Sequence, residues 1–475
     1  MRAAWPEPGN AGIGSCRAAR FAYNILMSVP SVAPPNNPAA RPKLPPGFRA
    51  RRGLNWAVVG LTYTSFYLCR YNFSYANKSI SDEFHFSKGD ISTILSCQFV
   101  AYGCGQIING LLTDRIGGKR AMLIGAAGTI TMSLAFGAAS FWGMLWLFAL
   151  LWGINGYMQA FGAPGFIKIN SAWFSERERG TFAGIFGCMI NLGRLLANNL
   201  LPSLLAGFVF LGMWSVPAQH WRWLFWIPAG VAALVAVLLA VFVKDTPEEC
   251  GFKNPFPGEA DHADQEVKTE IWTVFRIIVT NPIVWIMAVA YATTGAVRQS
   301  IDQWFPRYFE EVHHLAMTGA KFQWLGFLIP FAASAGSLLS GWISDRFFQA
   351  RRAPVAAIIY FTQVGVTFAA AQVTSVNWAL VFFVLIAFTV NSTHSLLGPA
   401  AAMDIGGRKM AAFASGIIDS FQYFGAALAI KGLGWVLDHY GWDYYFYYQV
   451  PFGLLGGVLM YSIAHRRSLK KGHTH

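Results

Sequence analysis

Long apolar segments recur along this chain, and short polar or basic connections separate them. A helix of about 20 apolar residues is long enough to cross the hydrocarbon core of a bilayer, which is ~30 Å thick. Twelve such segments can be drawn, at residues 54–76, 90–112, 121–139, 142–165, 180–206, 221–243, 282–305, 318–342, 353–373, 378–400, 412–435 and 444–464. The pattern therefore predicts an all-α polytopic membrane protein with twelve transmembrane helices.

Composition agrees with this prediction and narrows the function. The chain is 55% hydrophobic and only 12% charged, as expected of a protein surrounded by lipid. Its formal charge of +13 would suit nucleic-acid binding, but the basic residues lie in short connections between spans, where they set the orientation of the helices. We therefore expect a lipid bilayer around the protein, both termini in the cytoplasm, and no nucleic-acid partner.

The sequence carries no recognisable signature of an enzyme or of a cofactor site. Its six cysteines have no paired metal-ligand spacing, and four of them lie in apolar spans. Neither a Gly-x-Ser-x-Gly elbow nor a phosphate-binding P-loop with its lysine is present. We therefore expect no catalytic residues, no metal and no direct use of ATP.

The chain divides into five regions. Residues 1–53 are rich in Ala, Pro and Asn and lack the apolar core of a signal peptide, which predicts a disordered cytoplasmic tail, with Met27 as an alternative start. Residues 244–281 contain proline, glycine and acidic residues and are expected to form a hydrated cytoplasmic linker. This linker would separate an N-terminal six-helix half (54–243) from a C-terminal six-helix half (282–464). Residues 465–475 would be a cytoplasmic C-terminal tail.

A short motif repeats at equivalent places in the two halves. Gly-x-x-x-Asp-Arg follows the second span and again the eighth, so we expect two pseudo-symmetric halves with a substrate site between them near the membrane midplane. The glycine is expected to allow close helix approach, and the aspartate to face the amino-terminal end of a neighbouring helix. We predict gating roles for Gly110, Asp114, Arg115, Gly341, Asp345 and Arg346.

Two arginines lie deep inside apolar spans. Arg70 and Arg298 are each 16 residues beyond the first residue of their spans, which begin at residues 54 and 282. Charged side chains at this depth are costly and mark functional sites by default. Two like charges cannot stabilise each other, so they indicate a shared anionic ligand. The alternatives are that either arginine reaches an interface or pairs with a buried acid such as Asp302.

Several longer motifs resemble the major facilitator superfamily and, within it, the organophosphate:phosphate antiporter family. The match extends from about residue 54 to residue 464. The motifs are Tyr67-Leu-Cys-Arg70-Tyr71-Asn72-Phe73, Ala101-Tyr102-Gly103, Met158-Gln159 through Gly162 and Pro164 to Arg179-Gly180, Lys244-Asp-Thr-Pro-Glu-Glu-Cys-Gly251, Arg298 with Trp304 and Pro306, and Asp438-His-Tyr-Gly-Trp442.

This resemblance implies a function and a mechanism. Arg70 and Arg298 would be the family's two phosphate-binding arginines, and a planar guanidinium suits phosphate oxygens. The protein would be a monomeric inner-membrane transporter that exchanges a phosphate ester (glycerol-3-phosphate, a sugar phosphate or a phosphoglycerate) for inorganic phosphate by alternating access. The alternatives are a membrane sensor of external sugar phosphate, or a proton-coupled carrier of another anion that depends on His394 or Asp302.

The sequence departs from the glycerol-phosphate branch at four positions. Tyr71 stands where that branch has lysine after the first arginine, and Gln106 replaces a lysine of the second span. Ala172 replaces a histidine, and Gln303 stands where that branch has aspartate, with Asp302 one position earlier. The identity of the substrate therefore cannot be transferred from that branch.

Other polar residues within the spans are further candidates for substrate binding. Tyr67, Tyr71, Tyr291 and Gln106 could donate hydrogen bonds to a substrate. Each of the remaining candidates has two alternative roles. For Lys168 they are contact with substrate or reach to the cytoplasmic surface, and for Arg194 they are the cation missing at Gln106 or a pair with a neighbouring helix. For Lys431 they are substrate selection or an anchor of its helix at the interface, and for His394 a proton carrier or a satisfied polar residue.

Overall fold

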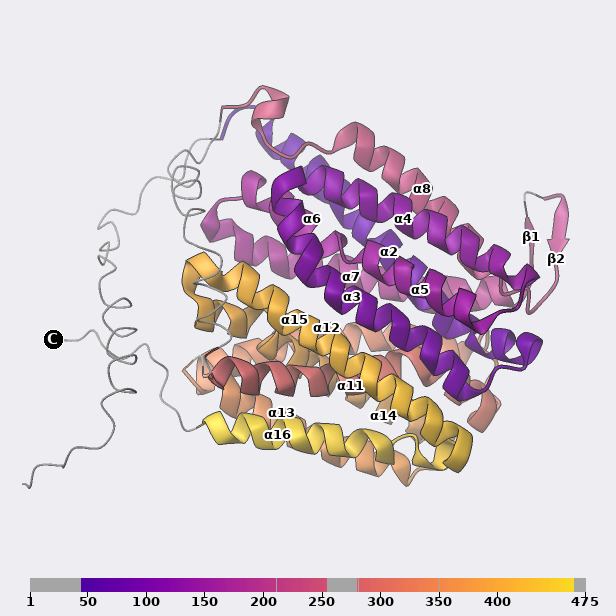
Figure 1. The fold of residues 1–475 in the computed structure, drawn as a ribbon. Helices are drawn as coiled ribbons and strands as arrows, with labels where there is room; N and C mark the ends of the chain where they lie inside the picture. Colours follow the sequence, from indigo (N-terminus) through magenta and orange to yellow (C-terminus); the bar gives the residue numbers. More distant parts are fainter. Residues whose placement is uncertain (1–43, 211, 254–279, 281, 350, 465–475) are drawn as a thin grey trace, which may run out of the picture. The chain divides into compact units, whose positions relative to one another are not determined.

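Long helices make up nearly all of the regular structure (Figure 1). A computed structural model of the protein describes residues 44–210, 212–253, 280, 282–349 and 351–464, and of residues 176–188 and 399–416 it describes only the backbone. The described elements from Pro45 onward belong to one compact unit. Most of the tail predicted for residues 1–53, much of the linker predicted for 244–281 and nearly all of the tail predicted for 465–475 lie outside the described residues.

The helices follow the order of the twelve predicted spans. The first group is α2 (Phe48–Phe84), α3 (Lys88–Ile116), α4 (Gly118–Ala138), α5 (Leu145–Gln159), α6 (Gly162–Trp173), α7 (Glu176–Leu205) and α8 (Trp223–Phe242). The second group is α11 (Pro282–His313), α12 (Ala320–Phe347), α13 (Arg352–Ala371), α14 (Val376–Leu397), α15 (Pro399–Tyr440) and α16 (Val450–Ala464). Short 3₁₀ turns lie at Ala139–Phe141, Glu248–Cys250, Trp442–Tyr444 and Tyr447–Gln449.

One predicted span is divided into two helices, α5 and α6. The break lies just before Gly162, where an added Cβ would come within 3.0 Å of the Phe66 ring. Pro164 then stands in the first turn of α6, where its missing N–H costs no helical hydrogen bond. Close packing against α2 and this proline together explain why the segment is interrupted.

A small β-hairpin is the exception to the predicted all-helical fold. Strand β1 (Phe208–Phe210) pairs antiparallel with β2 (Trp214–Val216) in the connection between α7 and α8. Gly212 has a positive φ of 71°, which a tight turn between two strands requires. Alternating aromatic residues at Phe208 and Phe210 favour strands here.

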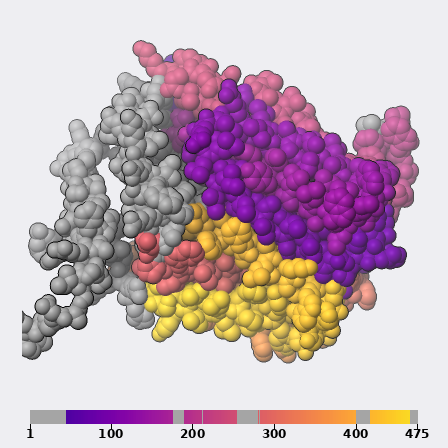
Figure 2. All heavy atoms as spheres, in the orientation of Figure 1, coloured from indigo at the N-terminus to yellow at the C-terminus, as the bar shows by residue number. Residues whose placement is uncertain are grey.

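The helices form two groups, coloured indigo to magenta and orange to yellow in Figure 1. In the first group, α2 packs against α7 and α8, and α4 against α5 and α8; in the second, α11 packs against α15 and α16, and α12 against α14. The groups meet where α3 packs on α15, α7 on α12 and α2 on α11. Figure 2 shows atoms of the two groups in contact along the face in view.

Among the described residues, six helical segments are long and apolar enough to cross a membrane by length and composition: Lys88–Ile116, Gly118–Phe141, Trp223–Phe242, Ala320–Phe347, Arg352–Ala371 and Val376–Leu397. Helices α2 and α11 fall outside this set because they carry many polar side chains, and most of those side chains are buried. The polar helices therefore lie inside the bundle, where Arg70 and Arg298 are shielded from lipid.

The folded part begins earlier, and extends further into the linker, than the sequence predicted. Helix α2 starts at Phe48, inside the predicted tail, because Phe48 is buried and stacks on Trp173 at 5.7 Å. The first residues of the predicted linker also pack on this half: Asp245 Oδ1 accepts a hydrogen bond of 2.7 Å from the backbone N–H of Lys119. This carboxylate therefore caps the amino-terminal end of α4.

Candidate functional site

Arg70 is held by one edge of its guanidinium group. It lies on α2 with 4% of its surface exposed, and its Nε donates a hydrogen bond of 2.8 Å to Gln159 Oε1. The rings of Tyr67 and Tyr102 lie 4.9 and 4.5 Å from the guanidinium carbon. Among the described residues, its two terminal nitrogens make no hydrogen bond, so they are available to an anionic ligand.

Arg298 occupies the equivalent place on α11 and is also buried, with 6% exposed. Its Nη1 lies 3.3 Å from Nε2 and 3.5 Å from Nδ1 of His394, and its Nε lies 4.0 Å from Asp302 Oδ2. Within the described part of the chain, that Nε has no hydrogen-bond acceptor. Arg298 therefore also has N–H groups that a ligand oxygen could satisfy.

The two arginines face a common group of tyrosines. Tyr67 and Tyr423 lie within electrostatic range of both guanidinium groups, and Tyr67 stacks on Tyr71 at 5.7 Å. Tyr423 in turn lies 4.2 Å from Tyr102, between centroids, across the contact of α15 with α3. One cation from each half thus borders the same aromatic surface, as a shared anion would require.

Arg194 pairs with an acid of the other half. Its Nη2 lies 2.5 Å from Asp302 Oδ1, and both residues are buried, with 3% and 6% exposed. The Tyr71 hydroxyl donates a hydrogen bond of 3.1 Å to the other carboxylate oxygen. Of the two roles open for Arg194, the structure has it paired with a neighbouring helix. Asp302 lies closer to Arg194 than to Arg298, whose Nε is 4.0 Å from Oδ2.

A third polar group extends from Arg298 toward α15. The Tyr291 hydroxyl lies 2.7 Å from His394 Nδ1 and donates a longer hydrogen bond of 3.4 Å to Asp419 Oδ1. Tyr291 and His394 were both predicted, and the structure brings them next to Arg298. Sequence reasoning missed Asp419, although an acidic residue within the predicted span 412–435 is itself a signal of function.

For the side chains that the structure describes, no hydrogen bond or ion pair joins three predicted substrate residues, Lys168, Lys431 and Gln106, to Arg70 or Arg298. Lys168 Nζ lies 3.2 Å from Asp114 Oδ1 at an exposed helix end, and Lys431 Nζ donates to Thr93 Oγ1 at 2.5 Å. Gln106 is buried on α3, but among the described residues it makes no hydrogen bond to either arginine. In this conformation Lys168 and Lys431 bind side chains other than those around the two arginines.

The two Gly-x-x-x-Asp-Arg motifs, which form the last turns of α3 and α12, differ from expectation. A Cβ added at Gly110 or Gly341 would meet no atom within 4 Å, so the expected close helix contact is not present at either glycine. The partner of Asp114 is Lys168 rather than the amino-terminal end of a helix. The remaining members, Arg115, Asp345 and Arg346, are exposed.

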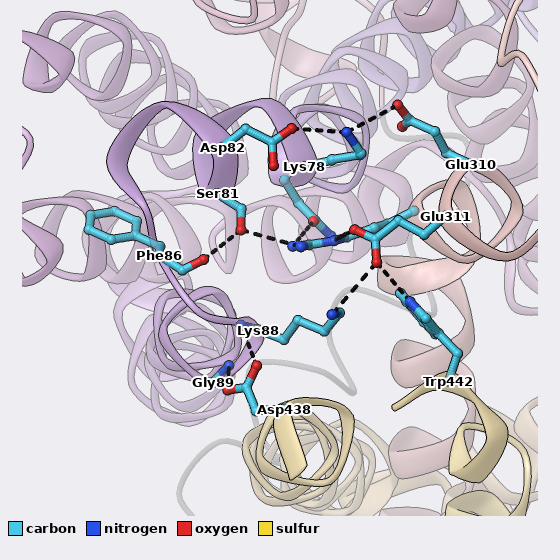
Figure 3. Close-up of polar contacts among 12 residues, drawn as sticks. Lys78, Ser81, Asp82, Phe86, Lys88, Gly89, Glu310, Glu311, Asp438 and Trp442 are labelled. Atoms are coloured by element: carbon cyan, nitrogen blue, oxygen red, sulfur yellow. Dashed lines mark hydrogen bonds and ion pairs between the residues drawn. The ribbon is translucent and has the colours of Figure 1, made fainter. Parts of the chain in front are cut away.

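At the opposite end of the bundle, polar contacts join the two halves (Figure 3). We call Asn77, Lys78, Ser81, Lys88, Arg307, Glu310, Glu311, Asp438 and Trp442 the outer-end cluster, because this end is predicted to face outside. Glu311 is its centre: Oε1 lies 2.6 Å from Arg307 Nε, and Oε2 lies 3.6 Å from Lys88 Nζ and 2.8 Å from Trp442 Nε1.

Two further sets of contacts extend this cluster across the interface. Arg307 donates hydrogen bonds to Asn77 Oδ1 at 3.0 Å and Ser81 Oγ at 3.3 Å, from α11 to α2. Asp438, at the end of α15, accepts hydrogen bonds from the backbone N–H groups of Lys88 (2.9 Å) and Gly89 (2.7 Å). A carboxylate of one half therefore caps the amino-terminal end of α3 in the other half.

Comparisons with known proteins agree with this architecture. The model of the Major Facilitator Superfamily matches residues 59–430. The glycerol-3-phosphate transporter of Bacillus subtilis (strain 168) is 28% identical over 402 residues, covering 81% of this chain and 86% of the relative. Membrane sensor protein UhpC of Escherichia coli (strain K12) is also 28% identical, over 417 residues, covering 82% of this chain and 87% of the relative.

A solved structure supports the fold alone. The inward-facing, occupied structure of a bacterial homologue of the human lysosomal transporter Spinster has a TM-score of 0.72 at 15% identity. The alignment covers 90% of this chain and 99% of that one.

Proposed function

Because the chain belongs to the Major Facilitator Superfamily and its relatives include a glycerol-3-phosphate transporter and the sensor UhpC, we propose that it exchanges an organic phosphate ester for inorganic phosphate. It would act as a monomer in the inner membrane with both termini in the cytoplasm. The observation that supports this proposal most strongly is the pair of buried arginines, one from each half, with unused N–H groups beside shared tyrosines.

The geometry suggests why transport would be coupled as exchange. Without a ligand, the charges of Arg70 and Arg298 repel each other and oppose close approach of the two halves around the site. A bound phosphate dianion removes this penalty, so it favours the occluded state over the open ones. A ligand can shift a conformational equilibrium only by such a difference in affinity. The empty carrier would therefore rarely reorient, and each turnover would need an anion in each direction.

The distribution of contacts indicates which side is closed. Among the described side chains, polar contacts between the halves lie near the middle and in the outer-end cluster. We infer that this conformation is closed toward the predicted outside. The outer-end cluster would then have to separate each time the site opens outward.

We predict that Glu311→Gln loosens this closed end. The substitution weakens the contacts with Arg307 and Lys88, and a partly exposed ion pair is worth up to about 1 kcal/mol, or roughly a 5-fold change in an equilibrium. Hydrogen–deuterium exchange of peptides from the start of α3 should accelerate by about that factor. Glu310→Gln, which loses only the 3.7 Å contact to Lys78, should have a smaller effect. Equal exchange in all three proteins would contradict the assignment.

The pH dependence of this closed end follows from the same contacts. Burial raises the pKa of the Glu311 carboxyl, but Arg307, the Trp442 N–H and Lys88 together outweigh burial and lower that pKa. The contribution of Glu311 to closure is therefore complete above the usual carboxyl pKa. It is lost only as the pH falls through the lowered value.

The proposed function is tested by phosphate exchange in proteoliposomes. Vesicles are loaded with radiolabelled phosphate, and phosphate, glycerol-3-phosphate, glucose-6-phosphate or 3-phosphoglycerate is added outside in turn. Efflux that depends on external phosphate and on at least one ester is expected. If no anion provokes efflux from folded protein, the exchange proposal fails.

A sensor is the second candidate, since UhpC is as similar in identity as the glycerol-3-phosphate transporter. A sensor of the same fold would bind a phosphate ester without sustained exchange. Ligand binding with intact affinity, together with no efflux in the assay above, would favour this candidate.

A further inference from the structure

Asp419 is a carboxylate without a cation of its own. It lies on α15, one turn before Tyr423, and is partly exposed, whereas Asp302 is buried and paired with Arg194. In the part of the chain that the structure describes, Asp419 makes no ion pair, and its one hydrogen bond is the 3.4 Å contact from Tyr291. A carboxylate can accept about four hydrogen bonds, so most of this capacity is unused.

The direction of hydrogen bonding keeps Asp419 an acceptor. Arg298 can only donate, and when it donates to the nearest His394 nitrogen, which is Nε2 at 3.3 Å from Nη1, that nitrogen is the acceptor. His394 is then neutral and carries its proton on Nδ1, which donates to the Tyr291 oxygen at 2.7 Å. The Tyr291 proton is left to point at Asp419 Oδ1. Each hydrogen bond in the series from Arg298 to Asp419 then has one donor and one acceptor.

Asp419 also lies beside the proposed phosphate site. Both Arg298 and Arg70 are within electrostatic range of its carboxylate. A phosphoryl group held by the two arginines would place the rest of the ligand near a negative charge with free acceptor positions. A hydroxyl or ammonium group on the ligand could donate to Asp419, whereas a second acidic group would be repelled.

Building on the proposed phosphate site, we propose that Asp419 selects the organic part of the ligand. The substrate class is a phosphate monoester whose organic part carries hydroxyl or amino groups and no second acidic group. Glycerol-3-phosphate fits this class, and 3-phosphoglycerate does not. The discrimination comes from repulsion of the wrong ligand as much as from hydrogen bonding to the right one.

The test measures how well each ester competes with labelled phosphate in the exchange assay. The wild-type protein should prefer glycerol-3-phosphate to 3-phosphoglycerate by at least ~10-fold, and Asp419→Asn should reduce this ratio by about 10-fold, because the neutral amide no longer repels the second acidic group. Asp443→Asn, an exposed aspartate on another segment, is the matched control and should keep the wild-type ratio.

The outcomes separate this inference from the function on which it rests. If phosphate exchange is intact but wild-type protein takes 3-phosphoglycerate as well as glycerol-3-phosphate, the role of Asp419 is overturned without any need for a variant. An unchanged ratio in folded Asp419→Asn would overturn it as well. Failure of wild-type phosphate exchange would overturn the proposed function, and this inference with it.

Discussion

Replacing either Arg70 or Arg298 with lysine is expected to reduce phosphate exchange by at least ~100-fold, because lysine keeps the charge but loses the planar fork that binds two phosphate oxygens. Each hydrogen bond to a charged group is worth about 1.5–3 kcal/mol, so losing two of them accounts for this factor. The measurement is labelled-phosphate efflux from proteoliposomes with equal amounts of folded protein.

The same substitution at an arginine outside the proposed site shows whether the loss of exchange is specific to Arg70 and Arg298. Arg222 binds Glu83 and Ser140 at the predicted outer surface, and it is not part of the proposed site. Arg222→Lys should retain most of the exchange activity. Normal exchange by both Arg70→Lys and Arg298→Lys would refute the assignment of these arginines as phosphate ligands.

The second large effect is expected at the buried pair of Arg194 and Asp302. Removing one partner of a buried ion pair leaves an uncompensated charge and costs about 3–5 kcal/mol. Arg194→Gln would leave Asp302 free to neutralise Arg298, and Asp302→Asn would leave Arg194 unpaired. Each single variant should therefore lose more than ~10-fold in phosphate exchange or in the yield of folded protein.

The double variant decides the role of this pair. If Arg194 only compensates Asp302, replacing both should restore folding and much of the exchange activity. If Arg194 itself binds substrate, the double variant should be as inactive as Arg194→Gln alone. A double-mutant cycle in the exchange assay measures the coupling directly. Additive losses would contradict the pairing as the reason for Arg194.

The order of the spans along the chain was predictable because lipid requires a continuous apolar segment for each crossing, whereas the division of one span into α5 and α6 was not. The ends of the helices were not predictable either. Helices α2 and α11 run on to Phe84 and His313, well past predicted ends at residues 76 and 305. Hydropathy reports the thickness of the membrane, whereas these helices continue outside it through polar residues such as Lys78 and Glu311.

The candidate site was predictable only in part. Arg70 and Arg298 were identifiable because a buried charge is costly, and the same argument should have singled out Asp419. The partner of Arg194 was not predictable, since Asp302 is 108 residues away and only helix packing brings the two together. The outer-end cluster was hidden for the same reason: its residues come from α2, α3, α11, α15 and the turn at Trp442–Tyr444.

The central claim is that phosphate and a phosphate ester share one site built by Arg70 and Arg298. Equilibrium binding of radiolabelled phosphate to purified protein, with unlabelled glycerol-3-phosphate as competitor, tests it most directly. We predict one phosphate bound per chain, complete displacement by the ester, and loss of binding in both Arg→Lys variants. Phosphate that remains bound at saturating ester, or that binds equally well without either arginine, would contradict the shared site.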